Sequence, residues 1–85
     1  MIAKITISHF AVKHIPESSI KRIIEEVFGR DEDSASYSLD NYRHELNFFI
    51  EDPEDINAYM YDEIVQELRK HTITGADIRT KYINK

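Results

Sequence analysis

Cysteine and tryptophan are absent from this sequence of 85 residues, and glycine and proline occur only twice each. Without cysteine, the chain can form neither a disulfide framework nor a thiolate metal site. The scarcity of glycine and proline, with 41% hydrophobic residues, argues against disorder. No run approaches the ~18 apolar residues of a membrane span, and residues 1–10 lack the pattern of a signal peptide. We therefore expect a single domain over residues 1–85, without membrane contact, in the cytoplasm.

The net charge of −5 is distributed unevenly along the chain. Residues 1–30 carry five Lys and Arg against three Glu, a balance of +2. Residues 31–68 carry twelve Asp and Glu against one Arg, a balance of −11, whereas residues 69–85 carry five Lys and Arg against one Asp, a balance of +4. Either this is the ordinary surface of an acidic protein, or the fold gathers the charges into opposed patches.

Hydrophobic periodicity predicts a strand followed by a helix in residues 1–30. Over residues 2–8, alanine and isoleucine alternate with polar residues, which indicates a half-buried strand. Pro16 suits the first turn of a helix, and Gly29 suits its C-terminal end. Between them, apolar residues recur at helical spacing: Ile20, Ile23, Ile24, Val27 and Phe28.

Residues 34–50 alternate on both sides of Asp40 and Asn41, which predicts a β-hairpin with a two-residue turn. The cross-strand pairs expected from this turn are Leu39 with Tyr42, Tyr37 with His44, and Ala35 with Leu46. One face of the hairpin is then apolar, whereas the other is rich in serine and carries Phe49. A slip of one residue would mix the two sets, so the pattern supports this register.

A second helix is predicted over residues 52–71. Asp52 is the expected N-cap, Pro53 takes the first helical position, and the acids that follow lie near the positive end of the helix dipole. The expected apolar stripe comprises Ile56, Tyr59, Met60, Ile64 and Leu68. After Gly75, alternation over residues 76–83 predicts a last strand.

The order strand, helix, strand, strand, helix, strand predicts an α+β fold, the ferredoxin-like sandwich, with two helices on one face of a four-stranded antiparallel sheet. In that architecture the sheet order is 4-1-3-2, so the first and last strands are neighbours. Lys4, Arg79 and Lys81 then share the open face of the sheet. The acidic second helix is expected on the opposite side, so the charge segregation along the chain becomes a segregation in space.

Sequence motifs of enzymes are missing. The chain has no Gly-rich phosphate loop, and a nucleophile would have to be Ser or Thr, with no readable Ser-His-acid arrangement. His9 and His14 flank the expected first loop, but two histidines without a clear third ligand are more often surface residues than a metal site. We therefore expect no enzymatic activity, no cofactor and no bound metal.

Three resemblances suggest classes of function. The opening MIAKITI, the helix entry at Ile15 and Pro16, and the acidic second helix resemble the DNA-damage-inducible inhibitor family DinI over roughly residues 1–70. This resemblance implies an inhibitor that acts through an acidic helix on a nucleic-acid-dependent partner. The topology and Phe49 resemble RNA-recognition motifs, without that family's glycines and paired aromatics. Size and composition resemble small phage proteins that neutralise host defence, including RNase toxins of toxin–antitoxin systems.

Two hypotheses follow. The first is a phage counter-defence, antitoxin-like inhibitor that binds a basic nucleic-acid-processing protein, such as a toxin endoribonuclease, with or without bound RNA. Its expected partner-binding residues are Glu54, Asp55, Tyr61, Asp62, Glu63 and Glu67, with Tyr61 as the apolar anchor. The alternative is an RNA- or single-stranded-DNA-binding module that uses the open sheet face. Its expected contacts are Lys4, Arg43, Phe49, Arg79 and Lys81. A homodimer through the sheet face is compatible with either hypothesis.

Overall fold

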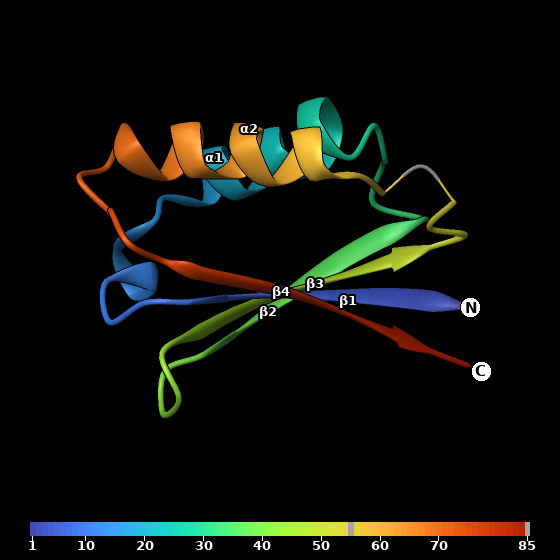
Figure 1. Ribbon diagram of the computed structural model, residues 1–85, viewed down its shortest axis with the longest axis horizontal. Coiled ribbons are helices and arrows are strands. Elements are labelled where there is room, and N and C mark those ends of the chain that lie inside the picture. The colour runs from blue at the N-terminus through green and yellow to red at the C-terminus, as the bar shows by residue number, and fades with distance from the viewer. Residues whose placement is uncertain (55, 85) are drawn as a thin grey trace.

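The computed structural model describes residues 1–54 and 56–84, and it has one four-stranded antiparallel sheet with the helices on one side (Figure 1). The strands are β1 (Ile2–Ser8), β2 (Ala35–Asp40), β3 (Glu45–Glu51) and β4 (Asp77–Ile83). Their order is β2-β3-β1-β4, so the first and last strands are neighbours as predicted. This confirms the α+β fold, and the strand order is compatible with the ferredoxin-like arrangement.

The first helix forms where the periodicity placed it. A 3-10 turn, η1 (Val12–His14), precedes α1 (Glu17–Arg22), which continues as the π-helical turn η2 (Ile23–Val27). Pro16 is the N-cap residue, one position earlier than expected. Gly29 follows with a φ of +63°, a conformation that glycine adopts without steric cost, and this ends the helix as predicted.

The core lies between the sheet and the helices. Ala3, Ile5 and Ile7 of β1 are fully buried, which confirms the alternation predicted for that strand. The rings of Phe28 and Phe48 meet edge to face, with centroids 5.5 Å apart, and join the end of the first helix to β3. The central strand β1 is therefore covered by helix on one face and open on the other.

The hairpin loop between β2 and β3 is longer than predicted. Asp40 ends β2 and Glu45 begins β3, so residues 41–44 form the loop. The Oδ1 atom of Asp40 accepts hydrogen bonds from the backbone N–H groups of Tyr42 (3.0 Å) and Arg43 (3.1 Å), and His44 has a φ of +56°. The two-residue turn was wrong because this side-chain cap stabilises the wider loop.

The register of the hairpin changes accordingly. The observed pairs are Leu39 with Leu46, Tyr37 with Phe48, and Ala35 with Ile50. The partner of Ala35 thus moves by four residues, from Leu46 to Ile50. Because four is even, every strand residue keeps its predicted face. Tyr42 and His44, which were expected on the apolar face, are instead exposed in the loop.

The second helix, α2 (Ala58–Arg69), begins five residues later than predicted, because its first residue was expected at Pro53. Asp52 has a φ of +49°, and the N-cap is Asn57, whose Oδ1 accepts a hydrogen bond from the N–H of Tyr59 (2.9 Å). Asn is as good a cap as Asp, and here it prevails. The expected stripe also changes, because Tyr59 is 80% exposed whereas Ile64 and Leu68 are buried.

Candidate functional site: two charged surfaces

The acidic residues expected on the second helix do not form a single array. Asp62 and Glu63 are exposed on α2. Glu54 is exposed but precedes the helix, and Asp55 lies outside the described residues. Glu63 lines a hollow between the two helices together with the cations Arg22 and Lys70. The predicted carboxylate row along α2 is therefore wrong as a continuous surface.

Glu67 is only 7% exposed and is used inside the helix layer, which corrects its predicted role in partner binding. Its Oε1 accepts a hydrogen bond from Lys70 Nζ (3.2 Å), and its Oε2 lies 3.8 Å from Nε2 of His71. Burial raises the pKa of Glu67, but the hydrogen bonds from Lys70 and Ser19 and the charges of Lys70 and Arg22 outweigh burial and hold that pKa below its ordinary value.

Tyr61 is the second correction. Its hydroxyl shares a hydrogen bond with Oγ1 of Thr80 on β4, and the side chain is half-buried between α2 and the sheet. The apolar anchor expected to reach a partner therefore connects α2 to β4. The prediction placed Tyr61 off the core stripe because it put Tyr59 on that stripe, whereas Tyr59 is exposed and Tyr61 lies at helical spacing from the buried Ile64 and Leu68.

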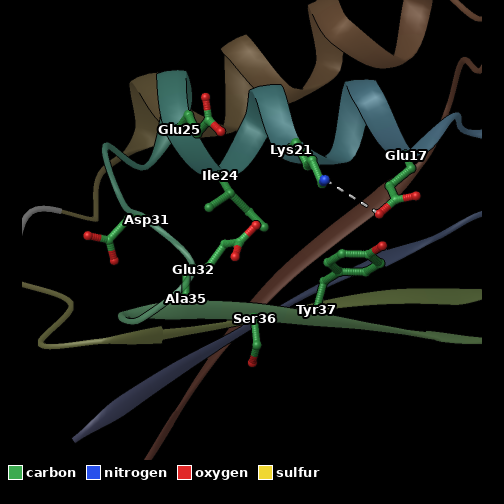
Figure 2. A pocket seen from close by; sticks show the side chains of 9 residues that line it. All are labelled: Glu17, Lys21, Ile24, Glu25, Asp31, Glu32, Ala35, Ser36 and Tyr37. Atoms are coloured by element: carbon green, nitrogen blue, oxygen red, sulfur yellow. Dashed lines mark ion pairs between the residues drawn. The ribbon is translucent and has the colours of Figure 1, made fainter.

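An acidic surface lies instead between the first helix and the edge strand β2, where the structure forms a groove of about 320 Å³. We call this the acidic groove, and it is lined by Glu17, Lys21, Ile24, Glu25, Asp31, Glu32, Ala35, Ser36 and Tyr37. Four carboxylates against one lysine give the lining a formal charge of −3. Figure 2 shows Tyr37 pointing from β2 towards α1, while Ser36 points to the other side of the sheet.

Local interactions hold the acidic groove in shape. Lys21 lies 3.7 Å from Glu17 one helical turn earlier, the ion pair drawn in Figure 2. Asp31 Oδ1 accepts hydrogen bonds from the backbone N–H groups of Asp33 and Ser34, which fixes the loop that leads into β2. The floor is apolar, because Ile24 and Ala35 are buried there. Sequence reasoning missed this groove because it depends on the packing of the first helix over β2, which hydrophobic periodicity does not report.

The predicted basic residues do come together on the open face of the sheet. Lys4 faces Lys81 and Thr6 faces Arg79 across the β1–β4 pair. A hollow of about 310 Å³, which we call the basic depression, is lined by Lys4, Thr6, Arg43, Glu45, Arg79, Thr80 and Lys81. Four cations against one carboxylate give its lining a formal charge of +3. Arg43 reaches it from the hairpin loop.

Phe49 does not line the basic depression. It is half-buried on β3 beside Lys4, and it lines a separate small hollow with Ile2 and Ser36. On the same face, Thr6 Oγ1 donates a hydrogen bond to Asn47 Oδ1 (2.7 Å), and Asn47 is buried. This part of the open face is therefore polar and internally hydrogen-bonded.

A further cluster that the sequence did not reveal joins Ser19 of α1 to His71. Ser19 Oγ and His71 Nε2 are 2.6 Å apart, and Glu67 Oε2 approaches the same ring nitrogen. In a catalytic triad the acid holds the opposite ring nitrogen, so that the imidazole can take the serine proton. Here the serine and the acid share one nitrogen. The cluster is therefore a contact between the helices and lacks triad geometry.

No group of three or more potential metal ligands occurs among the described residues. His9 is held by the backbone, since its Nδ1 accepts a hydrogen bond from the N–H of Ala11 (3.0 Å) and its Nε2 lies 3.0 Å from the carbonyl oxygen of Thr74. Within residues 1–54 and 56–84, no helix has the length and apolar character needed to cross a membrane.

Comparisons with known proteins add no family. No family model matches the chain, and neither the curated proteins nor the solved structures contain a match. The functional argument therefore depends on the two charged surfaces, which lie on opposite sides of the sheet.

Proposed function

We propose that this protein is a non-enzymatic binding protein that captures a basic, extended segment of a partner protein along β2. The observation that carries the proposal is an edge strand beside a groove of charge −3 with an apolar floor. A strand edge supplies main-chain affinity, whereas pockets for alternate side chains supply specificity. In this protein the strand edge and the acidic groove lie side by side, so one partner segment can use both.

The backbone of β2 is oriented for this mode of binding. The carbonyl oxygen of Ser34 accepts a hydrogen bond from the N–H of Glu51 on β3 (3.0 Å). Because successive residues of a strand direct their backbone groups to opposite edges, the N–H and C=O groups of Tyr37 and Leu39 point outward. A segment that pairs with them places every second side chain on the helix side of the sheet, towards the carboxylates of α1 and η2.

Charge selects the occupant. A second copy of this chain would bring two acidic grooves together, and like charges in contact oppose association. A partner segment with Lys or Arg at alternate positions is attracted instead, and its aliphatic stems can cover Tyr37 and Ile24. The expected partner is therefore a basic protein.

Inhibition is the biological outcome that we propose. Proteins that process nucleic acid, including RNase toxins, contact phosphate through Lys and Arg. Occupying such a segment in the acidic groove removes it from the nucleic acid. On this proposal the protein acts as an antitoxin-like inhibitor in the cytoplasm, the host cytoplasm if a phage encodes it.

A peptide titration tests the groove. The probe is a short peptide with Lys at every second position and Val or Thr between, compared with a peptide of the same composition whose lysines are clustered. We expect the alternating peptide to bind more tightly in calorimetry. The double change Glu25→Lys and Glu32→Lys should weaken its binding about tenfold at low salt. The matched control, Glu54→Lys with Asp62→Lys, alters net charge equally outside the groove and should change binding far less.

The strand edge has its own test. Leu39→Pro removes an outward N–H and leaves the ladder to β3 intact, since proline is tolerated at solvent-facing edge positions. We expect this variant to fold and to lose peptide binding, whereas Leu39→Ala binds as the wild type does. If the charge reversals inside the groove and the control reversals outside it weakened peptide binding equally, the acidic groove would be rejected as the binding site. Full binding by a folded Leu39→Pro variant would reject pairing along β2.

A further inference from the structure

The open face of the sheet carries a second site, independent of the acidic groove. We propose that it binds single-stranded nucleic acid, with the cations of the basic depression on phosphates and two exposed aromatic side chains, Tyr42 and Phe10, on bases. The site lies on the side of the sheet that faces away from α1 and α2 (Figure 1).

The charge of this face is opposite to that of the whole chain. The chain has a net charge of −5, yet the lining of the basic depression is +3. Lys4 and Lys81 are cross-strand neighbours. Arg79 precedes Lys81 by two positions and therefore lies on the same face of β4. Like charges directly opposite one another destabilise a sheet pair. An anion between Lys4 and Lys81 relieves that repulsion, so the face favours phosphate.

Two exposed aromatic side chains lie in the adjoining loops at the end of the sheet from which Arg43 reaches the basic depression. Tyr42 is 98% exposed and directly precedes Arg43, which lines the basic depression. The N–H of His9 donates to the carbonyl oxygen of His44 (3.0 Å), so the loop that carries Phe10 adjoins the hairpin loop. Phe10 is 73% exposed. Neither ring contributes to the core, and each offers a face on which an unpaired base can stack.

Phe10 is also held in place before any ligand arrives. Its ring stacks on His9, with centroids 4.5 Å apart and an interplanar angle of 23°. His9 in turn is fixed by its contacts with Ala11 and Thr74. A ring held this way loses little conformational freedom when a base stacks on it. Bases of a duplex are already stacked, so the aromatic pair selects single strands.

Carboxylates at the same end of the sheet set the strength of binding. Asp77 Oδ2 lies 2.9 Å from Nε of Arg79, and Ser8 separates Asp77 from Glu45 in the register. These acids compete with phosphate for Arg79 and Arg43. Neutralising Asp77 therefore strengthens binding, a change opposite in sign to the loss caused by neutralising a cation.

Fluorescence anisotropy with a labelled oligouridylate tests the site, and the matching oligothymidylate and a duplex of the same length serve as comparisons. We expect binding to both single strands at low salt, weaker binding to the duplex, and a slope of log K against log salt of about −3, roughly −0.7 for each of four phosphate contacts. Arg79→Gln and Lys81→Gln should each reduce the magnitude of the slope by about 0.7. Asp77→Asn should tighten binding.

Matched controls separate the site from net charge. Arg69→Gln removes one exposed cation from α2, on the other side of the sheet, and should leave affinity within about twofold of the wild type. Tyr42→Ala and Phe10→Ala should each weaken binding by about fivefold or more, the effect of one lost base stack. An Arg69→Gln loss equal to that of Arg79→Gln would reject the site. The site would also be rejected if polyglutamate displaced the labelled oligouridylate as well as unlabelled oligouridylate does. Failure of the wild type to bind at low salt would reject it too.

Discussion

Ser19 on α1 and His71 beyond the end of α2 share a hydrogen bond of 2.6 Å, and this contact joins the two helices above the sheet. Glu67 is the charged member of the same cluster, with Lys70 on its other oxygen. A buried carboxylate is stable only when such partners satisfy it. The cluster therefore makes the packing of α1 against α2 depend on the ionisation of one side chain.

Glu67 should make the stability of the protein depend on pH in the acidic range. Its pKa in the folded protein lies below the ordinary value of 4.5, so the carboxylate binds its proton more weakly in the folded than in the unfolded chain. The stabilisation is present in full above that ordinary value and is lost as pH falls through the lowered pKa. Glu67→Gln should cost about 1 kcal/mol at pH 7, and the cost should shrink on acidification.

Urea unfolding at neutral pH and at several acidic pH values measures this difference. The control is Glu63→Gln, a carboxylate on the same helix that is exposed. Its effect on the free energy of unfolding should be small at every pH, because surface ion pairs contribute little. A cost of Glu67→Gln that stays constant from neutral to acidic pH would contradict the account.

Phe48 and Phe49 are adjacent on β3 and offer a matched test of the two faces of the sheet. Phe48 is 0% exposed and packs against Phe28, whereas Phe49 is half-buried on the open face. Phe48→Asp should unfold the domain, since it buries an unpaired charge and forfeits about 3–5 kcal/mol of packing. Phe49→Asp should retain native chemical-shift dispersion. If Phe48→Asp also folded, Phe48 would not face the core, and the assignment of the helix-covered face of the sheet would be wrong.

Tyr61 is expected to be structural. Tyr61→Phe removes the hydroxyl that bonds Thr80 and should lower the free energy of unfolding by about 1 kcal/mol without affecting peptide binding in the acidic groove. A double-mutant cycle with Thr80→Val measures the coupling between the two side chains. A coupling energy of zero would mean that the contact between Tyr61 and Thr80 does not stabilise the protein. Weaker peptide binding by Tyr61→Phe would instead support Tyr61 as a partner-binding anchor.

Most of the fold follows from local pattern, and the errors have local causes. The alternation in β1 and the helical spacing from Ile20 to Phe28 reflect burial on one face, which tertiary structure preserves. The start of α2 was wrong because two good caps, Asp52 and Asn57, compete and sequence gives no means of ranking them. The hairpin loop was wrong because the capping role of Asp40 depends on side-chain geometry.

The two charged surfaces differ in how far the sequence predicts them. Three of the four cations of the basic depression were expected together because Lys4, Arg79 and Lys81 belong to neighbouring strands with known faces. The acidic groove needed the packing of α1 over β2, which no periodicity reports. Glu67 was misassigned because burial of a charged residue depends on partners such as Ser19, which lies 48 residues away in sequence.

Glycine substitutions in the hairpin loop distinguish the predicted two-residue turn from the observed four-residue loop. A two-residue turn at Asp40 and Asn41 would need Asn41 in the left-handed region, so that Asn41→Gly would stabilise the protein. In the structure His44 has the positive φ of +56° and Asn41 does not. His44→Gly should therefore raise the free energy of unfolding by about 1 kcal/mol, because a left-handed conformation costs a residue with a Cβ roughly that much. Asn41→Gly should be neutral or destabilising, since it only adds freedom to the unfolded chain. Thermal and urea unfolding of the two variants decide the matter, and stabilisation by Asn41→Gly alone would mean that the shorter turn is the one formed in solution.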